Sequence, residues 1–270
     1  MLGKLIKNEF KNTYKLMLFV YGAFLLLTIF GTVTAYLLGK DAIEVDFLSV
    51  SILIFYGLSF FGIFVATFVF ISVNFYRTMF SAQGYLTHTL PAKETSIFNA
   101  KLITAFVWIL TTVIILFISS LFIINGATNG DFWRDFTNLS YSEICHSFYV
   151  ETGYYFESLV RYIILFLIMG LLMIVLWIFT SLSIGQLSNK HRIGRSIGTG
   201  IGLYFTFQVI AVAAIIKYAG NCNFNINSED GSIPYFVNSL FSSSLILIVI
   251  FNLVMYGFCL YITNRKLNLE

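Results

Sequence analysis

The sequence predicts an all-α integral membrane protein with six transmembrane helices, an N-terminal interfacial amphipathic helix and both termini in the cytoplasm. Three observations predict this class: a composition that is 58% hydrophobic and only 11% charged, six long apolar runs, and a one-sided distribution of basic residues. Ordinary soluble domains carry roughly 25% charged residues. With 30 Phe and 16 Tyr among 270 residues, the chain has more apolar side chains than one soluble core of this size would bury.

The six apolar runs define the spans of a single transmembrane domain over residues 1–270. A bilayer core of roughly 30 Å needs about 20 helical residues at 1.5 Å per residue. The trimmed runs contain no Asp, Glu, Lys or Arg, and one such charge at mid-membrane costs about 2.5–3.5 kcal/mol. The predicted spans are about 16–38, 48–75, 102–124, 162–184, 196–216 and 236–262.

Basic residues set the predicted orientation. One side of the membrane takes the two termini and the loops at 76–101 and 185–195, with 12 basic and three acidic residues. The other side takes four basic and ten acidic residues. Cytoplasmic loops carry the excess of Lys and Arg, so both termini are predicted to be cytoplasmic. The net charge of +3 is thus a topology signal, and no basic cluster with interleaved aromatics indicates binding of a nucleic acid.

Residues 2–15 have the pattern of a short amphipathic helix. Lysines recur at spacings of three and four and so share one face, and apolar side chains occupy much of the rest. We expect this helix to lie in the inner interface with its lysines toward anionic lipid headgroups. The alternative is that these charges simply flank the first span. The lysines are Lys4, Lys7, Lys11 and Lys15.

The loop over about 125–160 faces the outer side and mixes aromatic residues with acids. Aromatic side chains with polar tips favour the membrane–water boundary, so we expect short helices on the outer surface. The alternative is a cap or gate over an opening. The candidate gate residues are Trp133, Phe136, Tyr154 and Tyr155.

Small and polar residues inside the spans are further candidates. Gly194, Gly198 and Gly202 stand four residues apart and form a stripe that lets another helix approach closely. That helix belongs to the same chain or to a second subunit, and we expect the contact within the chain. Gln208 and Asn252 either line a substrate path or make hydrogen bonds between helices.

Several kinds of site are missing from the sequence. There is no G-x-x-x-x-G-K-[ST] phosphate loop, so the chain is not expected to bind ATP in that way. His88, His146 and His191 are far apart and there is no C-x-x-C, so no metal site is predicted. A disulfide between Cys145 and Cys222, both in outer loops, is a hypothesis. The spans also lack the ionisable residues of gradient-driven carriers, so the chain is predicted to be neither an enzyme nor a pump with its own energy source.

The segment FSAQGYLTHTLPAKETSIFNAK, residues 80–101, separates two apolar runs on the cytoplasmic side. Pro91 suits the first turn of a new helix, and Leu90 before it is pushed toward an extended conformation. Gly84 provides a second break. Residues 85–90 between the two breaks are uncharged and include an aromatic side chain and two leucines. Such a segment suggests docking into a groove on another protein, the alternative being a solvated turn without a partner.

The letters F-S-A-Q-G-Y-L-T-H-T-L-P resemble the loop after the second span of ABC-2-type permeases, the membrane subunits of bacterial ABC exporters. S-I-G-Q-L-S-N-K-H-R, residues 183–192, resembles the turn after their fourth span. The resemblance covers nearly the whole chain in its number of spans and its cytoplasmic termini. It implies that the segment 80–91 is the coupling helix that seats in a separate ATPase subunit. The coupling residues would be Gly84, Tyr85, Leu86, Thr87, His88, Thr89, Leu90 and Pro91.

The same resemblance implies the rest of the assembly. ATP and Mg would be held by the partner ATPase, and two permease copies, identical or related, would lie in the bacterial plasma membrane. The expected function is outward movement of an amphiphile, such as an antimicrobial peptide, a lipid or a drug. The alternative is a membrane sensor or immunity protein that binds a peptide or lipid through its aromatic outer loop without pumping. That loop departs from the shortest family members, so no substrate is carried over from them.

Overall fold

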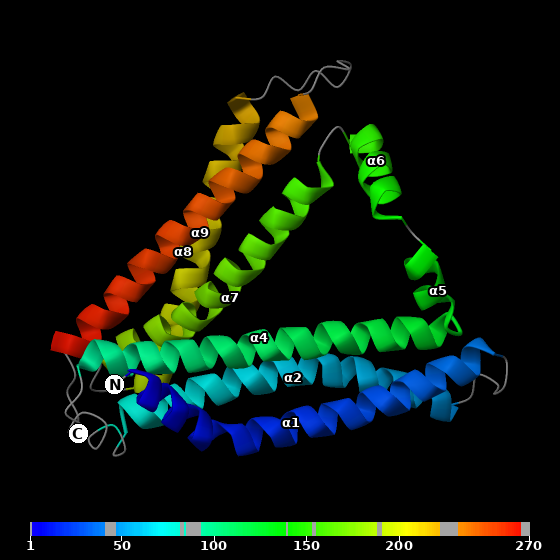
Figure 1. Ribbon diagram of the computed structural model, residues 1–270. Helices are drawn as coiled ribbons and strands as arrows, with labels where there is room; N and C mark the ends of the chain where they lie inside the picture. The colour runs from blue at the N-terminus through cyan, green and yellow to red at the C-terminus, as the bar shows by residue number, and fades with distance from the viewer. Residues whose placement is uncertain are drawn as a thin grey trace. The chain divides into compact units, whose positions relative to one another are not determined.

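The computed structural model describes residues 2–40, 47–81, 84, 93–138, 140–152, 155–187, 191–221 and 232–265. The elements in these ranges are α-helices, drawn in Figure 1. Their bounds are α1 (Leu2–Gly39), α2 (Phe47–Met79), α4 (Glu94–Ala127), α5 (Asp131–Asn138), α6 (Tyr141–Thr152), α7 (Phe156–Gln186), α8 (Arg192–Asn221) and α9 (Ser232–Arg265).

Six of these helices, α1, α2, α4, α7, α8 and α9, are long and apolar enough to cross a membrane. Each predicted span lies inside one of them. The prediction of an all-helical, multi-pass membrane protein is therefore confirmed. On which side the termini lie stays a prediction.

The N-terminal amphipathic helix is not a separate element. α1 runs without interruption from Leu2 to Gly39, so the segment predicted as the interfacial helix, residues 2–15, continues directly into the first span. No glycine or proline stands between Lys4 and Tyr21 to end the helix. The four lysines of the predicted face are exposed, and their contact with headgroups stays a prediction.

The chain divides into two compact units, which are described separately. Unit 1 contains Met1–Asn74 and Ser96–Ser140, and unit 2 contains Phe75–Thr95 and Tyr141–Glu270. Two of the divisions fall inside helices, near the end of α2 and at the start of α4. The segment Phe75–Thr95 thus belongs to unit 2, although the helices that it joins belong mostly to unit 1.

In unit 1, α1, α2 and α4 lie side by side (Figure 1). The buried residues of α1 recur every three or four positions, which gives the helix one inward face. Near the C-terminal end of α4, a Cβ on Gly126 would lie 2.9 Å from the carbonyl oxygen of Thr32 in α1. Glycine at this position therefore lets the backbones of α4 and α1 approach closely.

A tight turn joins α4 to α5. Asn129 and Gly130 have positive φ values of 54° and 91°, which end α4 and change the direction of the chain before α5. The side-chain amide of Asn129 donates a hydrogen bond of 2.7 Å to the carbonyl oxygen of Gly39, the last residue of α1. The start of α5 is thus attached to the end of α1 as well as to α4.

In unit 2, α7 contacts both α8 and α9. The indole N–H of Trp177 donates to the Gly200 carbonyl of α8 at 2.9 Å. On the other side, the Thr180 hydroxyl lies 3.2 Å from the sulfur of Cys259 on α9. Phe179 of α7 stacks on Phe75 with ring centroids 3.8 Å apart, and both rings are almost fully buried. Phe75 belongs to the last turns of α2, so these turns are held against α7.

The two short helices α5 and α6 are the elements expected in the long aromatic loop. α5 in unit 1 gathers three rings at centroid distances of 5.4–6.2 Å, Phe132, Trp133 and Phe136. α6 in unit 2 contacts the start of α7, where the ring of Phe148 lies 5.6 Å from that of Phe156. Both helices are therefore built around aromatic contacts.

The stacked pair in unit 2 leads to the first prediction. We expect Phe179→Ala to lower the free energy of unfolding by about 2 kcal/mol, less than the ~3–5 kcal/mol of soluble cores, because lipid or detergent tails replace part of the lost contact. Unfolding in mixed micelles is followed by thiol labelling of buried Cys259 in a chain with Cys145→Ser and Cys222→Ser. The control is Phe205→Ala, which removes a ring that is 61% exposed. Equal losses in the two variants would contradict the prediction.

Candidate functional site

The most distinctive feature of unit 1 is a line of buried polar contacts between α1, α2 and α4, called the polar seam below. From Glu9 to Thr28 of α1 it covers 20 residues, about 29 Å of helix along the axis at 1.5 Å per residue. Polar groups inside a bilayer must be satisfied within the protein, and the members of the seam bond to one another. They are Glu9, Thr13, Tyr21 and Thr28 of α1, Tyr56 and Thr67 of α2, and Lys101, Trp108, Thr112 and Ser119 of α4.

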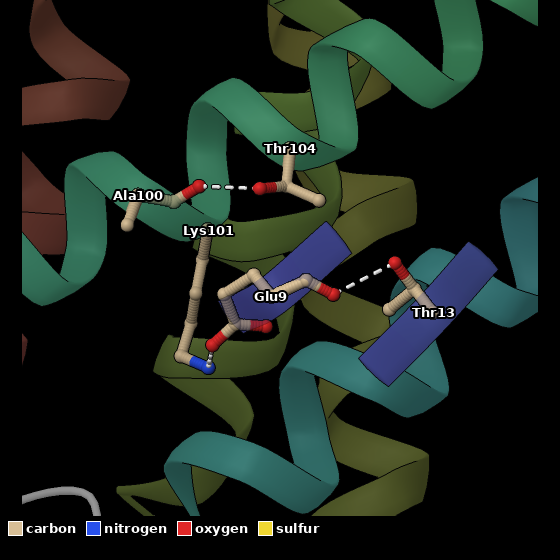
Figure 2. A network of polar contacts seen from close by, with 5 residues as sticks. All are labelled: Glu9, Thr13, Ala100, Lys101 and Thr104. Carbon is tan, nitrogen blue, oxygen red and sulfur yellow. Dashed lines mark hydrogen bonds and ion pairs between the residues drawn. The ribbon is translucent and has the colours of Figure 1, made fainter. Parts of the chain in front are cut away.

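An ion pair forms the first contact of the seam. Figure 2 shows Lys101 reaching across from α4 to Glu9, with 2.6 Å between Nζ and Oε1. The Lys101 side chain is 3% exposed and that of Glu9 is 17% exposed. The Lys101 ammonium group is shielded from water and needs a partner charge to be stable. The pair therefore fixes the register of α1 against α4.

The next contacts centre on Trp108. Its indole N–H donates to the Thr13 hydroxyl at 3.0 Å, and that hydroxyl donates in turn to the Glu9 carbonyl at 2.9 Å (Figure 2). The backbone carbonyl oxygen of Trp108 accepts a hydrogen bond from the Tyr21 hydroxyl at 3.1 Å. The Tyr21 hydroxyl also lies 2.9 Å from the Thr112 hydroxyl. Tyr21 of α1 thus bonds to both a side chain and a backbone carbonyl of α4.

Two hydroxyl groups of α4 connect all three helices. Thr112 bonds to Tyr21 of α1 and, at 3.1 Å, to Thr67 of α2. Seven residues later, Ser119 bonds to Thr28 of α1 at 3.0 Å and to Tyr56 of α2 at 2.8 Å. The seven-residue spacing returns to the same face of α4 after two turns. The polar seam therefore holds α1, α2 and α4 as one bundle.

Sequence reasoning missed the seam. Lys101 was assigned to a cytoplasmic loop and Glu9 to the interfacial helix, yet they pair with each other. A partial signal was present, because Thr112 and Ser119 stand seven residues apart in a run that is mostly apolar. Such spacing places hydroxyl groups on one helix face, although it does not name their partners.

The predicted coupling residues lie mostly outside the described part of the chain, which includes Gly84 but none of residues 85–92. Gly84 is buried, and its N–H donates to the Ser81 carbonyl at 2.7 Å. A Cβ on Gly84 would lie 2.5 Å from the Met79 carbonyl oxygen. A larger side chain at this position would clash with the end of α2, so glycine fits here.

The predicted glycine stripe does not pack within the described residues of the chain. Gly194, Gly198 and Gly202 are exposed, and no described atom lies within 4 Å of a Cβ built on any of them. Gly200, on another face of α8, makes the contact with α7 instead. Ser196 and Gly200 are the buried positions on this part of α8, so packing of the stripe within the chain stays a prediction. A contact with a second subunit stays open.

The two polar residues of the predicted path are far from equivalent. Asn252 is 5% exposed, and its amide N–H donates to the Met169 carbonyl of α7 at 3.1 Å. Gln208 is exposed on α8. Asn252 therefore bonds to α7 rather than to Gln208, which gives it a structural role between α9 and α7. A substrate path along Gln208 stays a prediction.

Of the predicted gate residues, Tyr154 lies outside the described residues. Trp133 and Phe136 in unit 1 are 42% and 58% exposed, and Tyr155 in unit 2 is 67% exposed. These exposures suit a surface that meets lipid headgroups or a ligand. Whether the rings form a gate is not tested.

Cys145 is half-buried on α6, and its proposed partner Cys222 lies outside the described residues, so the disulfide is not tested. A hydrogen bond between Cys145 and Tyr141, together with the charge of Glu157, raises the pKa of Tyr141 to about 12. The Tyr141 hydroxyl donates to the Glu157 carboxylate at 3.3 Å. Among the residues that the structure describes, no three His, Cys, Asp or Glu side chains gather as a metal site would require.

The ion pair leads to the second prediction. We expect Glu9→Gln to lower the free energy of unfolding by about 3 kcal/mol, since it leaves the buried Lys101 charge without its partner, and Lys101→Met to cost less, since the Glu9 carboxylate is half-buried. The double variant is expected to regain at least half of that loss, because no unpaired charge remains. Unfolding in mixed micelles, followed by far-UV circular dichroism, measures all three. The exposed pair of Asp131 and Arg134 is the control, and Asp131→Asn should change stability by less than about 0.5 kcal/mol.

The third prediction separates seam hydroxyls from ordinary ones. Thr112→Val removes bonds to two other helices and should cost about 1 kcal/mol, within the range measured for hydrogen bonds between membrane helices. Thr111→Val is the matched control, because the Thr111 hydroxyl bonds only to the Val107 carbonyl of its own helix among the contacts described. The same unfolding assay applies, and equal effects at the two neighbouring positions would disprove the seam's role.

Comparison of the chain with protein-family models, with curated proteins and with solved structures finds no match. The family resemblance read from the loop sequence thus stays a hypothesis. What the chain does has to be argued from its own residues and contacts.

Proposed function

We propose that the chain is the membrane-spanning permease subunit of an ATP-driven ABC exporter in the bacterial plasma membrane. A separate ATPase subunit would supply the energy and hold ATP and Mg, since the sequence has no phosphate loop of its own. Two permease copies, identical or related, would form the translocation pathway. The substrate would be an amphiphilic peptide, lipid or drug moved outward.

The observation that carries the proposal is the place of the segment 80–93 between two long helices. α2 and α4 contain 33 and 34 residues, about 50 Å of helix, against a bilayer core of roughly 30 Å. Both helices are therefore long enough to extend beyond the hydrocarbon. The segment between them carries the G-Y-L-T-H-T-L-P letters that resemble a coupling helix.

Contacts on both sides of this segment support a role in transmission. On one side, Lys101 attaches the first turns of α4 to α1 through Glu9. On the other, Phe75 in the last turns of α2 stacks on Phe179 of α7. The segment is thus covalently continuous with two helices that are each fixed to a further helix. A displacement of the segment by an ATPase would be passed on to α1 and to α7.

The mechanism that follows is a change between two arrangements of the helices. Closure of the ATPase pair on ATP would displace the coupling segment of each permease copy, and α2 and α4 would move with it. ATP binding would thereby favour one arrangement of the pathway over the other. Within the permease, the contribution of Tyr85, Leu86, His88 and Leu90 would be to seat in the ATPase, and that of Pro91 to set the direction in which α4 departs.

The exposed aromatic side chains of α5 and of Tyr155, directly before α7, favour a second candidate. A sensor or immunity protein would use Trp133, Phe136 and Tyr155 to bind a peptide or lipid without pumping. Such a protein would need no ATPase, and this difference decides between the two functions.

The fourth prediction tests the coupling segment. We expect Leu86→Asp with Leu90→Asp to abolish co-purification of the chain with a candidate ATPase subunit, because two charges enter an apolar contact. The control is Leu187→Asp, which places a charge at an exposed leucine after α7, on the same predicted side of the membrane. Circular dichroism verifies that both variants are folded. Unchanged binding of the double variant would move the contact elsewhere, and absence of any ATPase partner would favour the sensor.

A further inference from the structure

Unit 2 contains a cavity of about 330 Å³ between α7, α8 and α9. The α7 residues that line it recur at helical spacing and so form one face of that helix. The rest of the lining comes from α8 and α9. The residues that matter here are Gly170, Met173, Trp177, Tyr204, Phe207 and Phe251.

The wall of the cavity is almost entirely apolar. The indole N–H of Trp177 is already bonded to the Gly200 carbonyl, so the ring presents only its hydrocarbon surface. The rings of Phe207 and Phe251 lie 5.1 Å apart and form a second aromatic wall. A cavity that offers no hydrogen-bonding partners does not hold water, and it gives a charged or polar headgroup nothing to bind.

The cavity lies at the depth of the hydrocarbon. Gly170 stands near the midpoint of α7, Phe207 near that of α8 and Phe251 near that of α9. Helices that cross the bilayer have their midpoints among the ends of the acyl chains. Tyr204 lines the cavity and is 55% exposed, so the cavity opens to the surface of unit 2 beside this ring.

We propose that this cavity binds one acyl chain of a bilayer phospholipid, inserted sideways between the three helices. An apolar cavity of about 150 Å³ holds a six-carbon ring, so a cavity of 330 Å³ has room for a chain segment of about a dozen carbons. Dispersion contacts favour this occupant, since an empty space leaves the lining side chains without partners on one side. Gly170 leaves the necessary room, because no described atom lies within 4 Å of a Cβ built on it.

This lipid site does not depend on the proposed permease function. A phospholipid chain would occupy the cavity with or without an ATPase on the cytoplasmic side. Failure of one proposal therefore leaves the other standing, and the experiment uses the purified full chain alone.

The test is photolabelling in lipid nanodiscs. The probe is phosphatidylglycerol with a diazirine near the end of one acyl chain, added in increasing amounts to unlabelled phosphatidylglycerol, and mass spectrometry locates the labelled residues. We expect labelling of Met173, Phe207 and Phe251 that reaches saturation. Gly170→Leu should lower this labelling about five-fold, because its side chain occupies the space of the acyl chain.

The matched control is Gly198→Leu. Gly198 also has no described atom within 4 Å of a built Cβ, and it does not line the cavity. In the Gly198→Leu variant, labelling of the cavity residues should equal that in the unchanged chain. Labelling that rises without saturation, and equally at exposed residues such as Ile201 and Val209, would mean ordinary surrounding lipid and would overturn the proposal. Unchanged labelling of a folded Gly170→Leu variant would also overturn it.

A second measurement covers the case in which Gly170→Leu does not fold. In a chain with Trp133→Phe, phospholipid brominated near the chain ends should quench the fluorescence of Trp177, which lines the cavity, and leave that of Trp108, which is 9% exposed, largely unchanged. Absence of the Trp177 quenching would overturn the proposal.

Discussion

Lipid tails are as apolar as the side chains of a neighbouring helix. Burial of apolar area therefore contributes little to the association of two membrane helices. This constraint explains where the protein places its few polar residues. In unit 1, hydroxyl groups and one ion pair lie along the contact between α1, α2 and α4, and each bonds to a neighbouring helix. Unit 2 relies more on shape, with stacked rings and the close approach of Gly200 to α7. The two units thus meet the same constraint by different means.

The ion pair between Glu9 and Lys101 is the strongest single constraint in unit 1. Desolvation of two charges is expensive, and the gain from pairing them depends on good geometry, so the pair adds more to specificity than to stability. It permits one register of α1 against α4, because a slip by one turn would bury two separate charges. If the predicted coupling segment transmits force, this register would matter for the proposed function, since a force on the first turns of α4 would act directly on α1.

The spans could be predicted from the sequence because length and hydropathy alone decide them, and all six predicted runs lie inside helices. The helix ends could not, since Lys101 looks like a loop residue until its partner is known. Helical spacing identified the glycines of α8 as a stripe but did not tell which face of α8 turns inward, and Gly200 rather than Gly194 or Gly198 meets α7. Position in the sequence shows which residues share a face, whereas tertiary contacts decide what that face meets.

The hydrogen bond from Asn129 to Gly39 has a mechanical consequence when it is taken together with the ion pair. α1 and α4 are attached to each other near both ends, by Glu9 and Lys101 at one and by Gly39 and Asn129 at the other. Two rods fastened in this way cannot slide or splay, so they act as one lever. A tilt imposed where α4 begins must then reappear at the opposite end of the lever, where the two-residue turn carries α5 and its aromatic face. A tilt of α4 that begins on one side of the membrane would in this way displace Trp133 and Phe136 on the other side.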